Sequence, residues 1–271
     1  MGAAKNNADF GVEVFRLKEI AEALRLAKEK GEPIDAPTKT HPGLTVPGAF
    51  EVQRITVDEA VKRGDRHVGW KLGNIAKVMQ QAFGLDHPDY GFLLGSSFAY
   101  EGSKIALSSF IKPYVELEPA FVLKKPLRGP NVTVADVASA IDYAIPAVEI
   151  IDSRVKNWTI TLEDTLADNG STGAIILGGT PRLITNLDLG NTKGTLYFND
   201  RAITSGTTRN ILGNPLAATA WLVNRLAEFD VEFLPGQVIM PGSCLEAMPM
   251  DKPGIWECRF EGWGSVVFEA V

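Results

Sequence analysis

Cysteine and histidine are scarce in this sequence. It contains two cysteines, Cys244 and Cys258, and three histidines in 271 residues. Beyond one pair, two cysteines can form neither a disulfide framework nor a cysteine-based metal site. His41, His67 and His87 show no i, i+3 or i, i+4 pairing and no serine or cysteine partner. The sequence therefore gives little support to a histidine-based catalytic triad.

Long apolar runs and clusters of basic residues are also absent. No run reaches the length of a membrane span, and the start, MGAAKNNADFG, lacks the apolar segment of a signal peptide. The 33 acidic residues outnumber the 27 lysines and arginines and give a formal net charge of -6. These absences argue against nucleic-acid and membrane partners, and they predict a cytoplasmic protein.

The spacing of the apolar residues predicts helices first and strands afterwards. Residues 9–30 place Phe15, Ile20 and Leu24 at helical spacing, and residues 47–63 behave similarly. Short apolar segments typical of strands dominate the rest of the chain.

Two helices are expected to interrupt these strands. The first covers residues 133–143 and opens with the capping pattern Thr133-Val134-Ala135-Asp136, and the second covers 214–228 and opens with Asn214 and Pro215. Many strands with few regularly alternating helices predict an α+β fold that is rich in antiparallel pairs.

Three acidic residues lie inside apolar segments that are typical of strands. Glu116 and Glu118 stand two apart in YVELEPAFVL, so they share one face of the strand, about 6 to 7 Å apart at their Cα atoms. Glu149 lies in a similar frame in IPAVEIID. Buried like charges this close repel each other unless a cation lies between them. An all-oxygen set suits Mg²⁺, Mn²⁺ or Ca²⁺ better than Zn²⁺, whereas exposed edge strands would explain the acids without a metal.

Other polar residues are open to both structural and functional interpretations. Lys71 lies between apolar residues and two glycines in GWKLG. Such a lysine is a general acid or base, a partner of a substrate carboxylate or, most commonly, a charged residue at a strand end. Asp89 in HPDYG and the segments DNGSTG and MPGSC are also typical of turns.

Together these segments resemble one enzyme family. GWKLG, HPDYGFLL, VELEPAFVLKKPLRGP, AIPAVEIIDSR, NWTITLEDTLADNGSTG and MPGS occur in the order and approximate spacing of the 2-keto-4-pentenoate hydratase and 4-oxalocrotonate decarboxylase family of the fumarylacetoacetate hydrolase superfamily. The resemblance implies a mixed β-sandwich roll, with an N-terminal helical region at residues 1–67 and a catalytic domain at 68–271. It also implies Mg²⁺ or Mn²⁺ bound by Glu116, Glu118 and Glu149, catalysis by Lys71 and Asp89, and substrate contacts from Leu72, Asp168, Asn169 and Ser243.

The reaction implied by the resemblance is the addition of water to a 2-hydroxy-2,4-dienoate in the meta-cleavage catabolism of aromatic compounds. The product is a 4-hydroxy-2-oxo acid, and Lys71 with Asp89 is expected to transfer the proton. A decarboxylase acting on 2-oxohex-3-enedioate would use the same metal-bound 2-oxo group and is the alternative. The segments expected around the pocket, GWKLGNIA, DNGSTG and MPGSCLEAMPM, offer no cation besides Lys71. We therefore expect a short substrate with an uncharged tail.

Two other classes of function are weaker alternatives. An acylpyruvate hydrolase of the superfamily would carry a His-x-x-Glu pair, but none of the three histidines has a glutamate three residues later. A non-catalytic partner in a complex is disfavoured because the three acids and Lys71 are retained. We expect a homo-oligomer, and a complex with a neighbouring pathway enzyme remains an open expectation.

Overall fold

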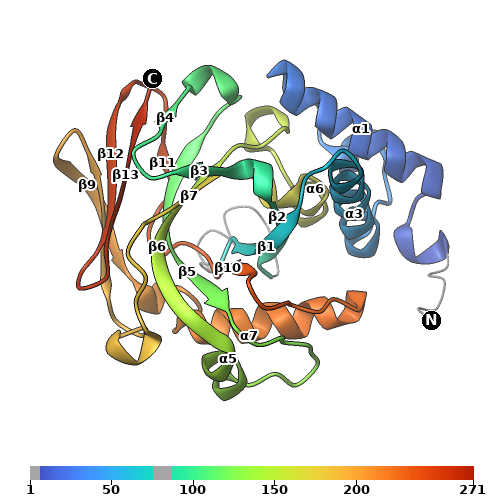
Figure 1. Ribbon diagram of the computed structural model, residues 1–271. Helices are drawn as coiled ribbons and strands as arrows, with labels where there is room; N and C mark the ends of the chain where they lie inside the picture. Colours follow the sequence, from blue (N-terminus) through green and yellow to red (C-terminus); the bar gives the residue numbers. More distant parts are fainter. Residues whose placement is uncertain (1–6, 76–86) are drawn as a thin grey trace.

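The computed structural model of the chain describes residues 7–75 and 87–271. Figure 1 shows a large sheet that curls around the centre of the molecule, a second sheet on one side of it, and helices α1 and α3 on the other side. The α-helices are α1 Val14–Lys30, α2 Pro37–Thr40, α3 Val46–Lys62, α5 Val134–Ala140, α6 Leu162–Ala167 and α7 Pro215–Leu226. None of the helices in the described ranges combines the length and apolar character that a membrane span requires.

The strands form two sheets. Their bounds are β1 His67–Gly73, β2 Asp89–Leu94, β3 Phe98–Tyr100, β4 Lys104–Ile105, β5 Tyr114–Leu123, β6 Ile141–Ile151, β7 Thr172–Leu177, β8 Lys193–Phe198, β9 Arg201–Thr207, β10 Val238–Met240, β11 Met248–Pro249, β12 Gly254–Phe260 and β13 Gly264–Ala270. The large sheet has the order β2-β1-β10-β5-β6-β7-β3, with β11 also paired to β5, and the small sheet has the order β4-β13-β12-β8-β9. Parallel pairs β1·β10, β3·β7 and β4·β13 occur beside the antiparallel ones, so both sheets are mixed. The predicted α+β fold with mixed sheets is confirmed.

The helix α1 is shorter than the sequence predicts. Its apolar face buries Leu17, Ile20, Ala21, Leu24 and Ala27, whereas Phe15, which the predicted stripe included, is 53% exposed. The helix begins at Val14 and not at residue 9, because a separate 3-10 turn is followed by Gly11 in the left-handed region at φ 71°. It ends at the predicted position, where Gly31 adopts φ 68°.

The helix α5 also differs from its prediction at one end. Its start is confirmed, because the Thr133 side chain accepts a hydrogen bond from the Asp136 backbone and the Asp136 side chain accepts from the Thr133 backbone. The helix ends at Ala140 and not at residue 143, because Ile141 is already extended and pairs with Leu123 of β5. Tertiary pairing with a neighbouring strand therefore overrides the local helical pattern.

The two faces of the strand pair β5–β6 have different environments. Val115, Leu117 and Phe121 point into a large hydrophobic cluster that also contains residues of α1, α3 and the small sheet. The opposite face carries the acidic residues and continues into a smaller cluster that includes Ala120, Ile145 and Ala147. The large cluster joins the N-terminal helices to the sheets, and the division at residues 67 and 68 stays a prediction.

Candidate active site

Three carboxylates meet on one face of the strand pair β5–β6. Glu116 and Glu149 are directly opposed partners in the antiparallel ladder, and Glu118 lies two residues further along β5. One oxygen atom from each side chain can be chosen so that all three lie within 4.8 Å of one another. Glu118 and Glu149 are completely buried, and Glu116 is partly exposed to a pocket. The alternative of solvent-facing edge strands is therefore excluded for this cluster.

Few hydrogen bonds compensate the buried charge of these carboxylates. Glu118 accepts a bond from the Gly242 backbone at 2.9 Å, and Glu149 accepts one from the Thr172 hydroxyl at 3.1 Å. The other oxygen of Glu118, Oε1, is buried and has no hydrogen-bond partner among the described residues. Burial first, and then repulsion from Glu149, raise the pKa of Glu116 to about 8, and burial also raises the pKa of Glu118 and of Glu149. An orphaned buried oxygen in an all-oxygen, electron-rich set fits a hard divalent cation.

Lys71 stands beside this cluster in the middle of β1 and is 2% exposed. Its Nζ lies 3.4 Å from Glu149 Oε2 and 3.9 Å from Asp89 Oδ1, and it donates a hydrogen bond to the Gly170 carbonyl at 2.8 Å. Burial alone would lower the pKa of Lys71, but the charges of Glu149 and Asp89 outweigh burial and raise this pKa above its ordinary value. The interpretation of Lys71 as a charged residue at a strand end is therefore wrong.

Asp89 is held with one oxygen toward the lysine. Its Oδ2 accepts hydrogen bonds from the Asn74 amide and the Thr165 hydroxyl, each at 2.7 Å, while Oδ1 faces Lys71. The close approach depends on Gly73, because a Cβ at that position would lie 2.3 Å from Asp89 Oδ1 and 2.8 Å from Lys71 Nζ. The sequence suggested a turn at Asp89, but Asp89 is instead the first residue of strand β2.

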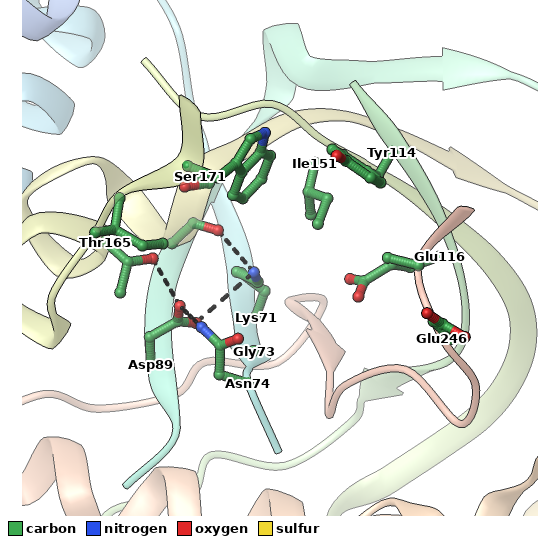
Figure 2. A pocket seen from close by; sticks show the side chains of 14 residues that line it. Lys71, Gly73, Asn74, Asp89, Tyr114, Glu116, Ile151, Thr165, Ser171 and Glu246 are labelled. Atoms are coloured by element: carbon green, nitrogen blue, oxygen red, sulfur yellow. Dashed lines mark hydrogen bonds and ion pairs between the residues drawn. The ribbon is translucent and has the colours of Figure 1, made fainter. Parts of the chain in front are cut away.

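A pocket opens above the lysine and Glu116. Figure 2 shows Lys71, Asp89 and Asn74 on one side of it, Glu116 and Glu246 on the other, and Tyr114 and Ile151 along one edge. Its described lining consists of Lys71, Gly73, Asn74, Asp89, Tyr114, Glu116, Ile151, Trp158, Ile160, Thr165, Gly170, Ser171, Glu246 and Ala247. The pocket therefore combines the ionisable side chains of Lys71, Asp89 and Glu116 with an apolar wall.

The four residues expected to contact substrate have side chains outside this described lining. Leu72 is fully buried in the large hydrophobic cluster, because it alternates with Lys71 along β1. Asp168 forms a buried ion pair with Arg154, and Asn169 bonds to the Phe92 backbone. Ser243 donates hydrogen bonds to the carbonyl oxygens of its own loop and of β5.

Several residues that line the pocket are not among those predicted from the sequence. Tyr114 and Trp158 meet edge to face, with ring centroids 5.5 Å apart, and Ile160 and Glu246 complete this part of the lining. Tyr114 and Trp158 lie at the edges of segments that carry the family resemblance, so proximity to those motifs was the available signal.

The mixed sheet carries three clustered carboxylates and a buried lysine under one pocket, which is the arrangement of an enzyme active site. No family model matches the chain. Individual proteins do match it closely. The chain is 38% identical over 253 residues to a 2-oxo-hept-4-ene-1,7-dioate hydratase of Escherichia coli, covering 91% of this chain and 95% of that protein. It is 34% identical over 250 residues to a 2-keto-4-pentenoate hydratase of Burkholderia vietnamiensis, covering 92% and 95%.

Solved structures give the same relationship. A 4-oxalocrotonate decarboxylase from Pseudomonas putida G7, complexed with magnesium and adipate, superimposes with a TM-score of 0.93 at 31% identity over 96% of this chain and 99% of that chain. A fumarylpyruvate hydrolase from Pseudomonas aeruginosa shares the fold at 11% identity, with a TM-score of 0.60 over 75% and 89% of the two chains. The chain belongs to the 2-keto-4-pentenoate hydratase family, and it is an enzyme of the lyase class.

Proposed function

We propose that the protein is a divalent-metal-dependent hydratase that converts a short 2-hydroxy-2,4-dienoate into a 4-hydroxy-2-oxo acid. The observation that carries this proposal is the combination of three clustered carboxylates with a buried Lys71–Asp89 pair beneath one pocket. The names of the relatives support hydration more often than decarboxylation.

The metal would be bound by Glu116, Glu118 and Glu149, whose oxygens are already clustered. A bound divalent cation would supply a Lewis acid that polarises the 2-oxo group of the substrate. We propose Mg²⁺ or Mn²⁺, and the magnesium in the decarboxylase structure supports this choice. The charges of Glu149 and Asp89, followed by those of Glu116 and Glu118, raise the pKa of Lys71 in the metal-free protein.

Lys71 and Asp89 would handle the protons of the reaction. In the hydratase reaction the dienol proton is lost, C5 gains a proton, and water then adds its hydroxyl group at C4 and its proton at C3. Lys71 carries N–H donors at the pocket floor and is fixed by Gly170, so it would hold the proton that is transferred. Asp89 is fixed by two hydrogen bonds and would orient the ammonium group.

The apolar part of the lining supports a substrate with an uncharged tail. Tyr114, Ile151, Trp158 and Ile160 supply aromatic and aliphatic surface, and Lys71 is the only cation among the described lining residues. A second substrate carboxylate would normally require a basic partner. We therefore assign tail contacts to these four residues. The homo-oligomer, the pathway complex and the cytoplasmic location remain predictions from the sequence.

One experiment separates hydratase from decarboxylase. The purified protein with Mg²⁺ is offered 2-hydroxypenta-2,4-dienoate and, separately, 2-oxohex-3-enedioate, and the products are followed by NMR. We expect the 4-hydroxy-2-oxo acid from the first substrate and little CO₂ from the second. Rapid decarboxylation without hydration would replace the proposed reaction by the alternative. With the dienoate, Lys71→Ala should lower kcat by about 10²-fold, and a change below about 3-fold would remove Lys71 from the mechanism.

A further inference from the structure

Three consecutive residues next to Lys71 adopt a left-handed backbone. Asn169, Gly170 and Ser171 have φ values of 55°, 60° and 55°. Such values are uncommon outside glycine, and strain of this kind persists only where surrounding contacts hold it. The turn links α6 to β7, and its Gly170 carbonyl is the acceptor for the buried Lys71 ammonium group.

Asn169 fixes this turn against strand β2. Its side-chain amide donates to the Phe92 carbonyl at 2.9 Å, and its side-chain oxygen accepts from the Phe92 backbone N–H at 2.8 Å. The neighbouring Gly91 is the ladder partner of Lys71, and a Cβ on Gly91 would lie 2.6 Å from the Asn169 carbonyl oxygen. The turn therefore rests directly on the strand pair that carries the lysine.

Arg154 and Asp152, which follow strand β6, hold the turn from its other side. The Arg154 guanidinium donates to the Asp168 carboxylate and carbonyl and to the Thr172 carbonyl. The Asp152 backbone N–H donates to the Ser171 carbonyl at 2.8 Å. With both flanks fixed in this way, the one group of the turn that reaches the reactive lysine is the Gly170 carbonyl.

We infer that Asn169 is a positioning residue, which aims the Gly170 carbonyl at Lys71 and thereby sets the direction of the lysine ammonium group in the pocket. This inference rests on the proposed role of Lys71 in proton transfer. It differs from a substrate contact, because both polar atoms of the Asn169 amide are already bonded to Phe92. The effect should appear in kcat, since a misdirected proton donor slows the chemical step even when substrate binds normally.

The test is a double-mutant cycle between Asn169 and Lys71. Asn169→Ala should lower kcat for hydration on the order of 10- to 100-fold, with KM changed by less than about 3-fold. In a Lys71→Ala background the same substitution should change kcat by less than about 3-fold, because the group through which it acts is gone. An equal loss in both backgrounds would show a general structural role and overturn the inference.

The chain offers a matched control at Asn224. Its amide makes the same two-way pair with the Val132 backbone, at 2.9 and 2.8 Å, and it lies on α7, outside the described pocket lining. Asn224→Ala should keep kcat within about 2-fold of wild type while losing a comparable number of hydrogen bonds. Asn169→Gly tolerates the left-handed backbone and serves if Asn169→Ala does not fold. Unchanged kcat in a folded Asn169 variant would also overturn the inference.

A measurement without turnover separates this inference from the proposed reaction. In the metal-free protein, the ¹⁵N resonance of the Lys71 ammonium group is identified by its loss in Lys71→Ala. We expect Asn169→Ala to shift this resonance and to speed the exchange of its protons with water, and Asn224→Ala to leave both unchanged. An unchanged Lys71 resonance in the Asn169 variant rejects the positioning role. Failure of the wild-type protein to hydrate any dienoate, with the resonance shifted as expected, would reject only the proposed reaction.

Discussion

The metal-free protein should lose stability as the pH rises from 6.5 to 8. The pKa of Glu116 is about 8 in the folded protein, against 4.5 for an ordinary glutamate. Between these two values the folded state binds more protons than the unfolded state, so the free energy of unfolding falls with increasing pH. Lys71 has a raised pKa and stays charged in both states below about 10, so it adds no slope in this window. Burial lowers the pKa of His67 and acts in the opposite sense, mainly below about pH 6.5.

The shift of Glu116 alone gives the minimum size of this effect, because the raised pKa values of Glu118 and Glu149 act in the same sense. A proton bound with a pKa of about 8 and released over this pH range changes the free energy of unfolding by roughly 1.6 kcal/mol. For 271 residues the entropy of unfolding is about 0.6 kcal/mol/K. The metal-free Tm should therefore fall by at least about 3 °C between pH 6.5 and 8.

The assay is thermal unfolding followed by circular dichroism, in the presence of a chelator. Glu116→Gln should reduce the slope of Tm against pH, because it removes one of the three carboxylates with raised pKa values. Glu232→Gln, which changes an exposed acid outside the described pocket lining, should retain the slope. Saturating Mg²⁺ should raise Tm more at pH 8 than at pH 6.5, since metal ligands must be deprotonated. A metal-free Tm that is flat or rises over this range would refute the proposed cause of the raised pKa values.

Two further predictions concern the metal site and the lysine environment. Glu149→Gln should weaken Mn²⁺ binding by about 100-fold or more, because too little charge remains to dehydrate a hard cation, and the circular dichroism spectrum should be retained. Unchanged Mn²⁺ affinity in calorimetric titration would reject the three-carboxylate site. Gly73→Ala should lower kcat by about 10-fold or more, because the new Cβ would lie 2.3 Å from Asp89 Oδ1 and 2.8 Å from Lys71 Nζ. Its control is Gly95→Ala, where the nearest atom would lie 3.4 Å away, and equal activity of the two variants would contradict the argument.

The acidic cluster could be predicted from sequence because its spacing is local. Glu116 and Glu118 share a face through the two-residue period of a strand, and an apolar frame around an acid is visible without a structure. Glu149 was found by the same apolar frame in IPAVEIID, and the family resemblance implied the fold, which the structure confirms.

The pocket wall and the turn beside Lys71 could not be predicted in this way. Whether Asn169 faces a substrate or the Phe92 backbone depends on the left-handed conformation of three successive residues. The Asn-Gly pair in DNGSTG indicates a turn, but it does not indicate that the left-handed conformation continues through Ser171. Trp158 and Tyr114 meet only because β6 returns beside β5, and their contact has no sequence period. The end of α5 was missed for a similar reason, since pairing of Ile141 with a distant strand decided it.

The order of strands in the large sheet has a consequence for synthesis of the protein on the ribosome. The strand β10, Val238–Met240, lies between β1, which carries Lys71, and β5, which carries two of the acids. A nascent chain can pair β5 with β6 early, but it cannot bring the lysine strand into the same sheet until residue 240 has been made. At a translation rate of about 5 to 20 residues per second, several seconds pass between the synthesis of β6 and that of residue 240. During this time the lysine does not yet compensate the charge of the three carboxylates. Divalent cations that are present during translation can therefore bind the carboxylates of the β5–β6 pair before the active site is complete.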